Sequence, residues 1–303
     1  MEKLPVIIDA DPGIDDAVAL MMAIKSNKLD IKMLGASAGN IGIQDSSYNC
    51  LALLDMFDAS SIPVCAGNKK PFKRTTFGKT AFHGNHGMGG YVLEKSSREL
   101  TPTPSFEKMH EILEGSENKI TILTLAPLTN VALLLQNHPE DIKKIEKIVI
   151  MGGSTEEDGI KQPYPEFNIA SDPEACEAVL NSGAKIVIIP MELGHTAYLD
   201  WREVFQTKNT NLTGEILEII FRGYKDRHVK NGIATHDATA LAYLLAPEIY
   251  KTEEMNVYVK YFESIDSGVI ICDKKNKPNA IVATDLDIKK FKKLYFKLLK
   301  RCK

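Results

Sequence analysis

Val6-Ile7-Ile8-Asp9-Ala10-Asp11-Pro12-Gly13-Ile14-Asp15-Asp16-Ala17 is the stretch that decides how this chain is expected to fold. Its apolar start, residues 6–8, is typical of a strand buried on both faces of a parallel sheet. Pro12-Gly13 is a turn signal, and apolar residues from Ala17 to Ile24 then recur at helical spacing. The stretch therefore predicts a strand that turns directly into a helix, with acidic residues around the turn.

The same alternation of strand and helix continues along the chain. Further apolar, β-branched runs predict strands at 31–34, 120–125, 145–150 and 185–189. Helical patterns lie between or after them at 46–57, 128–135, 172–180 and 238–245. This order predicts an α/β fold: a single domain over residues 1–303 with a mostly parallel central sheet flanked by helices. Ligands of such sheets bind at the carboxyl ends of the strands, so we expect the active site there.

The bulk composition excludes several classes of protein. A formal net charge of -3 over 303 residues gives no reason to expect nucleic acid or an anionic membrane as a partner. The five cysteines are scattered and lack CxxC spacing, which argues against a disulfide framework or a zinc site. No apolar run is long enough for a membrane span or a signal peptide. We therefore expect a cytoplasmic protein, with residues 289–303 forming an amphipathic helix that has a basic face.

Four carboxylates crowd the turn after the first strand. Asp15 and Asp16 could be ordinary first-turn acids, which the helix dipole favours. Capping accounts for one or two acids, but not for Asp9, Asp11, Asp15 and Asp16 within eight residues. Their mutual repulsion would raise their pKa values unless a cation or hydrogen bonds compensated. All-oxygen ligands suit calcium or magnesium better than zinc, so the motif predicts a hard-cation site.

Three other segments carry candidate side chains, each with a simpler interpretation beside it. The pair His236-Asp237 opens a helical run, where such pairs are commonly surface or capping residues. Glu166 and Asn168 stand in what is equally an ordinary loop. His83 lies in a glycine-rich segment, which is typical either of a lid over a ligand or of a flexible surface loop.

Taken together, these motifs resemble the inosine–uridine-preferring nucleoside hydrolases. The acidic stretch Asp9-x-Asp11-Pro12-Gly13-x-Asp15-Asp16-Ala17 looks like the N-terminal signature of that family. The other motifs follow in the family's order: Ala38-Gly39-Asn40, Ala126-Pro127-Leu128-Thr129-Asn130, Met151-Gly152-Gly153, Glu166-Phe167-Asn168, Asp172-Pro173-Glu174-Ala175 and His236-Asp237. The resemblance covers about residues 5 to 290. It implies a Rossmann-like nucleoside hydrolase fold and hydrolysis of the N-glycosidic bond of ribonucleosides to ribose and a free base.

The resemblance also implies a calcium ion, whose ligands can be carried over by position. They would be Asp11, Asp16, the main-chain carbonyl of Leu125 and Asp237, with ribose hydroxyls and water completing the shell. Asp11 would touch both metal and water, which makes it the expected general base. Asp9 is expected to support the site from outside this set of ligands.

Substrate contacts follow from the same resemblance. Asp15, Asn40 and Asn168 match residues that hold the ribose diol. Glu166 and Asn168 match contacts towards the 5′ side of the ribose. Met151 lines the sugar pocket.

Two histidines are candidates for assisting the leaving base, because imidazole titrates near neutral pH. His236 matches the family position proposed for this role, and we favour it. His83 lies in the loop that closes over the base in relatives, and it is the alternative.

Two other functions compete with nucleoside hydrolysis. Asp9-x-Asp11 after a strand also resembles the start of haloacid-dehalogenase-type phosphatases, but these have Thr or Val where this chain has Gly13. A non-catalytic nucleoside or ribose sensor on the same scaffold is the second alternative, and the complete set of carboxylates argues against it. Departures from the family pattern, such as Ala238 and His86, leave purine, pyrimidine and modified nucleosides open as substrates. The resemblance further implies a homodimer or homotetramer that acts in nucleoside salvage.

Overall fold

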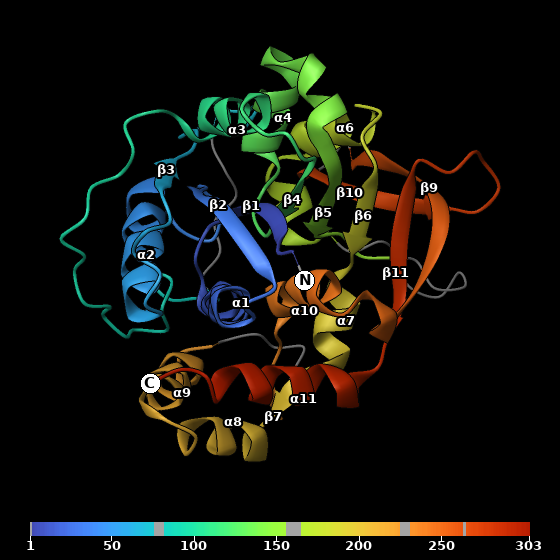
Figure 1. The fold of residues 1–303 in the computed structure, drawn as a ribbon. Helices are drawn as coiled ribbons and strands as arrows, with labels where there is room; N and C mark the ends of the chain where they lie inside the picture. Colours follow the sequence, from blue (N-terminus) through green and yellow to red (C-terminus); the bar gives the residue numbers. More distant parts are fainter. Residues whose placement is uncertain (1, 76–81, 156–164, 225–230, 263–264) are drawn as a thin grey trace.

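A nine-stranded sheet forms the centre of the computed structural model, in the order β10-β9-β11-β6-β5-β4-β1-β2-β3 (Figure 1). The structure describes residues 2–75, 82–155, 165–224, 231–262 and 265–303. The strands of this sheet are β1 (Leu4–Ala10), β2 (Leu29–Ala36), β3 (Val64–Ala66), β4 (Ile120–Thr124), β5 (Ile145–Met151), β6 (Ile186–Ile189), β9 (Tyr250–Phe262), β10 (Ile265–Asp273) and β11 (Ala280–Leu286). Two short strands, β7 (Leu199–Asp200) and β8 (Gly232–Ile233), pair separately.

All neighbouring strands from β11 across to β3 are parallel. At the other edge, β9 pairs antiparallel with both β11 and β10. The mostly parallel α/β class is therefore confirmed, and each expected strand lies within one or two residues of an observed one. The antiparallel strands β9 and β10 were not expected, because an edge hairpin mixes polar and apolar residues and lacks the continuous apolar run of a central strand.

Helices cover both faces of the sheet. They are α1 (Ile14–Lys25), α2 (Ile43–Met56), α3 (Ser105–Glu114), α4 (Thr129–Asn137), α5 (Phe167–Ser171), α6 (Pro173–Leu180), α7 (Met191–Thr196), α8 (Trp201–Lys208), α9 (Leu212–Arg222), α10 (His236–Leu245) and α11 (Ile288–Leu299), with 3-10 turns at Pro139–Lys144 (η1) and Pro247–Ile249 (η2). Successive side chains of β1 point to opposite faces. Val6 and Ile8 accordingly join the core beneath α1, whereas Ile7 joins the core beneath α3 and α4.

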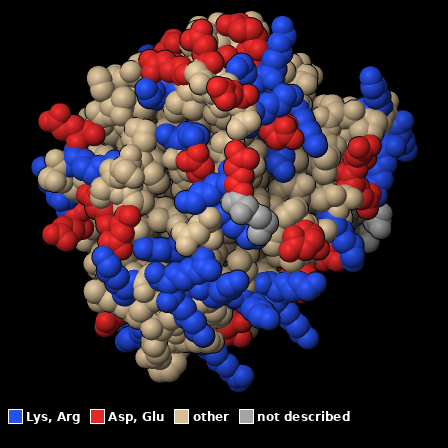
Figure 2. All heavy atoms as spheres, viewed as in Figure 1, with Lys and Arg blue, Asp and Glu red and all other residues tan. Residues whose placement is uncertain are grey.

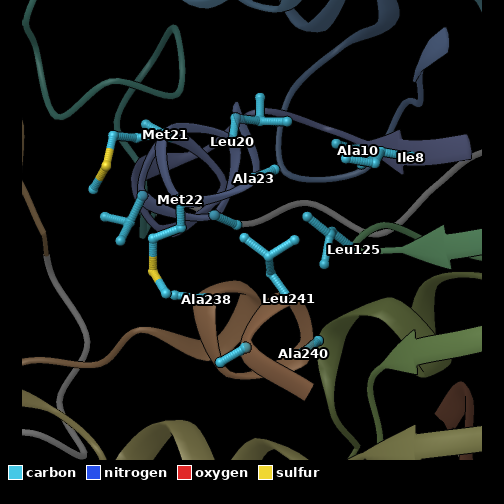
Figure 3. Close-up of a cluster of buried hydrophobic side chains, with 14 of the residues drawn as sticks. Ile8, Ala10, Leu20, Met21, Met22, Ala23, Leu125, Ala238, Ala240 and Leu241 are labelled. Carbon is cyan, nitrogen blue, oxygen red and sulfur yellow. The ribbon is translucent and has the colours of Figure 1, made fainter. Parts of the chain in front are cut away.

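Helices α1 and α10 lie side by side although they are far apart in the sequence (Figure 3). Small and flexible side chains make this approach possible: Met22 of α1 faces Ala238 and Leu241 of α10 in a buried cluster. Leu125, which follows β4, lies beside the same cluster. This packing sets the relative position of the two helix starts, where the acidic motif and His236-Asp237 stand.

The C-terminal helix α11 confirms the expected amphipathic pattern. Phe291, Tyr295, Leu298 and Leu299 are its buried residues. Figure 2 shows Lys and Arg side chains gathered in the lower part of the same view, where α11 lies in Figure 1. Among the described residues, no helix is long and apolar enough to span a membrane.

Candidate active site

The acidic site lies where the first turns of α1 and α10 meet at the carboxyl end of the sheet. Asp15, Asp16 and Asp237 are buried, and one oxygen from each lies within 4.8 Å of the others. Asp11 follows β1 directly and is fully buried. The strand-turn-helix stretch and the His-Asp pair, 221 positions apart from Asp16 to Asp237, therefore build one cluster.

Asn40 ties the loop after β2 to this cluster. Its backbone N–H donates to Asp11 Oδ2 at 2.5 Å, and its side-chain Nδ2 donates to Asp11 Oδ1 at 3.3 Å. Nδ2 also lies 3.4 Å from Asp16 Oδ2. The residue expected to hold ribose thus also orients two of the expected metal ligands.

Helix capping explains only one oxygen of the acidic motif. Asp16 Oδ2 accepts from the backbone N–H of Gly13 at 2.8 Å, as a first-turn acid does. Asp16 Oδ1 and Asp15 Oδ1 are buried and have no hydrogen-bond partner among the described residues. Buried polar atoms are rarely left this way, so these oxygens point to a ligand.

Burial, followed by repulsion between neighbouring carboxylates, raises the pKa of Asp16 to about 7. The same two causes raise the pKa of Asp11 and of Asp237 well above the usual range. Two ionised carboxylates about 5 Å apart repel by roughly 3 kcal/mol at an effective dielectric of about 20. A first-turn position returns only about 0.3–1 kcal/mol per acid. A divalent cation bound by oxygen ligands fits this donor set, because it offsets the repulsion that capping leaves.

Asn168 brings the Leu125 carbonyl to the site. Its Nδ2 donates to Leu125 O at 2.9 Å and lies 3.2 Å from Met151 O. A carbonyl oxygen has two lone pairs, so the Leu125 carbonyl can accept this bond and still face a cation. Asn168 thereby links the ends of β4 and β5.

Glu166 has a structural role that the sequence did not reveal. Its carboxylate caps α5 by accepting from the backbone N–H groups of Asn168 and Ile169, at 3.0 and 3.2 Å, and it also accepts from Gly153 at 2.9 Å. The side chain is buried, and this burial raises the pKa of the carboxyl group. Its expected ribose contact would therefore come from a carboxylate already oriented by three backbone donors.

His83 packs against the start of α1. Its Nδ1 accepts from the backbone N–H of Ile14 at 3.2 Å and lies 3.8 Å from Asp15 Oδ1. The glycines of its loop serve close approach: Gly89 has a φ of +62°, and a side chain there would collide with the carbonyl of Ile220 in α9. His83 is consequently a buried part of the site wall, packed edge to face at 6.3 Å from the Tyr224 ring.

His236 is the first residue of α10. Its Nδ1 lies 3.1 Å from the carbonyl oxygen of Met191 in α7. The ring of His195 meets the ring of His236 at 4.8 Å and 76°. Both histidines line the same pocket.

One cavity brings most of the expected residues together. Of those expected in the site, it is lined by Asp15, Asn40, His83, Leu125, Met151, Glu166, Asn168, His236 and Asp237. Asp11 and Asp16 are fully buried beneath it. The rest of the lining comes from Phe82, Pro165, Phe167, Ala170, Met191, His195 and Tyr224. Phe167 stands in the Glu166-Phe167-Asn168 motif, but Ala170 and Tyr224 stand in none, so no local signal identifies those two.

Asp9 is not part of the cluster formed by Asp15, Asp16 and Asp237. Its Oδ1 accepts from Asn130 Nδ2 at 3.0 Å, and its Oδ2 accepts from Ser37 Oγ at 2.8 Å. Burial raises its pKa to about 7. The carboxyl group thus joins β1 to the end of β2 and to α4, which agrees with the expected supporting role.

Comparisons with known proteins match this chain along nearly its whole length. The family model described as "Inosine-uridine preferring nucleoside hydrolase" matches residues 6–293. A curated relative from Escherichia coli O6:H1, "Non-specific ribonucleoside hydrolase RihC", is 36% identical over 293 residues, 95% of this chain and 96% of the relative. The protein of the same name from Klebsiella pneumoniae strain 342 is 33% identical over 295 residues, 96% of each chain. The solved structure of a plant nucleoside hydrolase, PpNRh1, superimposes with a TM-score of 0.91 at 26% identity and covers 99% of each chain.

Proposed function

This chain belongs to the inosine-uridine preferring nucleoside hydrolase family and hydrolyses the N-glycosidic bond of ribonucleosides, and we propose that the acidic pocket performs this reaction with Asp11 as the base. The observation that carries the proposal is the meeting of Asp15, Asp16 and Asp237 in one buried cluster beside the cavity, with buried Asp11 linked to Asp16 through Asn40. The family match over residues 6–293 argues against the phosphatase alternative.

Calcium is the proposed ion, held by Asp11, Asp16, Asp237 and the carbonyl of Leu125. Support comes from the orphaned oxygen of Asp16 and from a donor set made only of oxygens. When bound, calcium would chelate the ribose 2′ and 3′ hydroxyls and lower the pKa of a bound water.

The carboxylates are proposed to act on the sugar. Glycosidic cleavage passes through a transition state with positive charge on the ribose, and a preorganised group of carboxylates stabilises it. Asp11 accepts the proton of the attacking water, while Asp15, Asn40 and Asn168 hold the diol. Glu166 and Asn168 orient the 5′ side, and Met151 lines the sugar pocket.

His236 is proposed to protonate or hydrogen-bond the departing base. It lines the pocket at the start of α10. His83 is the less favoured candidate, because its Nδ1 is already an acceptor for the first turn of α1. His83 is instead assigned to substrate binding at the pocket wall.

The cellular setting is proposed from the family and from the cysteines. We place the enzyme in the cytoplasm, in nucleoside salvage, as a homodimer or homotetramer. The cysteines are all free thiols, which is compatible with a reducing compartment.

A screen of purine and pyrimidine ribonucleosides for release of free base tests the proposed function. Base release by the wild-type enzyme, and its loss in Asp11→Ala, is the expected result. Tight nucleoside binding without turnover would favour the sensor alternative. Full activity of Asp11→Ala would contradict the role of this residue as the base.

A further inference from the structure

Helix α7 determines which nitrogen of His236 can exchange a proton with a ligand. The Met191 carbonyl can only accept, so its 3.1 Å contact with Nδ1 requires a hydrogen on that nitrogen. A proton passed from His236 to a ligand must then leave from Nε2. The choice of tautomer is therefore made by the backbone of α7.

Gly194 makes this contact possible. A Cβ atom at Gly194 would stand 2.8 Å from both Cα and Cγ of His236, and closer still to Nδ1. Real Cβ atoms do not approach other atoms this closely. His236 Cα belongs to the first turn of α10, which also carries Asp237, so it cannot retreat without moving a proposed cation ligand.

His195 adds a third contact from the same short helix. Its ring meets the His236 ring nearly at right angles, at a centroid distance of 4.8 Å. Met191 and His195 both line the cavity beside His236. The Met191 carbonyl and the His195 ring thus orient the His236 imidazole, and Gly194 leaves the room for it.

We propose that Gly194 is a positioning residue for the reaction: it lets α7 hold His236 with Nδ1 bonded to the Met191 carbonyl and with Nε2 as the nitrogen that protonates the departing base. This inference rests on the leaving-group role of His236 under the proposed function. The transferred proton moves from Nε2 of the imidazolium to the base nitrogen as the N-glycosidic bond breaks, and the imidazole is left neutral.

Gly194→Ala tests the inference through the dependence on the leaving group. With inosine or uridine, whose bases need a proton, we expect kcat/KM to fall by about 10- to 100-fold, within the range that general acid catalysis contributes. With p-nitrophenyl riboside, whose leaving group needs no proton, the fall should stay within about 3-fold. In a His236→Ala background the glycine substitution should add no further loss on inosine, because both changes remove the same proton donor.

Gly115→Ala is the matched control. Gly115 ends α3, has a helical φ of -74°, and would place its Cβ no closer than 3.3 Å to any neighbour. We expect this variant to react at the wild-type rate with both classes of substrate. Equal losses on both substrates in Gly194→Ala would overturn the inference, because they would indicate general damage to the site.

Nitrogen-15 NMR of the imidazoles separates the inference from the proposed function. Wild-type His236 should show the Nδ1-protonated tautomer when neutral, and Gly194→Ala should lose it or show a mixture. An unchanged tautomer in Gly194→Ala would contradict the positioning role, whatever the kinetics. If His236→Ala itself affects both substrates equally, the leaving-group role fails instead, while the tautomer measurement still decides whether Gly194 sets the ring.

Discussion

Asp9 and Asp11 are both buried carboxylates in the strand-turn-helix stretch that opens the chain, but their surroundings differ. Asp9 accepts from Ser37 and Asn130, two neutral donors that satisfy both of its oxygens. Two residues later, Asp11 enters a cluster in which the nearest charged groups are other carboxylates. Burial raises the pKa of Asp9 and of Asp16 alike to about 7.

The difference lies in what completes each site. Around Asp9 the protein supplies all the hydrogen bonds, so the carboxyl group is part of the structure. Around Asp11 and Asp16 the protein supplies some donors but leaves Asp15 Oδ1 and Asp16 Oδ1 without one among the described residues. A shifted pKa alone therefore does not distinguish a structural acid from a functional one, whereas the inventory of hydrogen bonds does.

The largest expected effect follows from removing Asp11. Asp11→Ala should lower base release by about 10⁴-fold, because it removes both the proposed general base and a proposed cation ligand. The same variant, measured by thermal unfolding in EDTA, should lose less stability than Asp9→Ala, since relief of carboxylate repulsion offsets the loss of the bonds from Asn40. A large loss of stability in EDTA would show that Asp11, like Asp9, mainly stabilises the fold, and would contradict the difference proposed between them.

Removal of the cation should affect the acidic cluster around Asp16 and leave the site around Asp9 unchanged. EDTA should abolish base release, and added calcium should restore it. Calcium at about 100 times its Kd should stabilise the fold by about 2.7 kcal/mol, seen as a rise in Tm of roughly 5 °C. Asp16→Asn should lose most of this rise and Asp9→Asn should keep it. An equal rise in both variants would show that calcium binds elsewhere.

Asp9 should influence stability more than chemistry. Asp9→Ala leaves Ser37 and Asn130 without their acceptor, which we expect to cost about 2–4 kcal/mol in chemical unfolding. Asp9→Asn keeps the shape and one acceptor, so it should cost about 1 kcal/mol. Base release per folded molecule should stay within about 3-fold of wild type in both Asp9 variants, because Asp9 is not one of the proposed cation ligands. A loss comparable to that of Asp11→Ala would make Asp9 part of the reaction.

The smallest expected effect concerns Asp141, a carboxylate whose partner is a histidine side chain of the same protein, His110. His110 of α3 bonds through Nδ1 to Asp141 Oδ2 at 3.0 Å and stacks on His138 at 3.6 Å. The bond to Asp141, with the charges of Glu114 and Glu140, raises the pKa of His110. This stabilisation is fully present below the unfolded-state pKa and is lost as pH rises through the higher folded-state pKa. The Tm difference between wild type and His110→Gln should therefore be about 1–2 °C below pH 6 and vanish in alkaline solution. A difference that does not change with pH would mean that His110 contributes only packing.

Much of the site was predictable because its residues stand in local motifs. Asp11, Asp16 and Asp237 were expected as neighbours from the resemblance. The structure groups Asp16 with Asp237 and links Asp11 to Asp16 through Asn40. The bond from Gly153 to the Glu166 carboxylate was not predictable, because it depends on how close Gly153 comes to a helix that begins 14 residues later in the chain. Tyr224 was not expected either, because it does not stand in a pattern that identifies a pocket wall.

The sequence by itself determined the class of fold, the acidic turn after the first strand and the family of the enzyme. Periodicity and turn chemistry act over a few residues, so they can be read along the chain. Only the tertiary structure decided how the acids differ, because hydrogen-bond partners such as Asn130 for Asp9 come from distant segments. It also decided that Gly194 stands against His236, and therefore which nitrogen can deliver a proton. A tautomer is set by what surrounds a ring in space, and that arrangement exists only after α7 and α10 have packed.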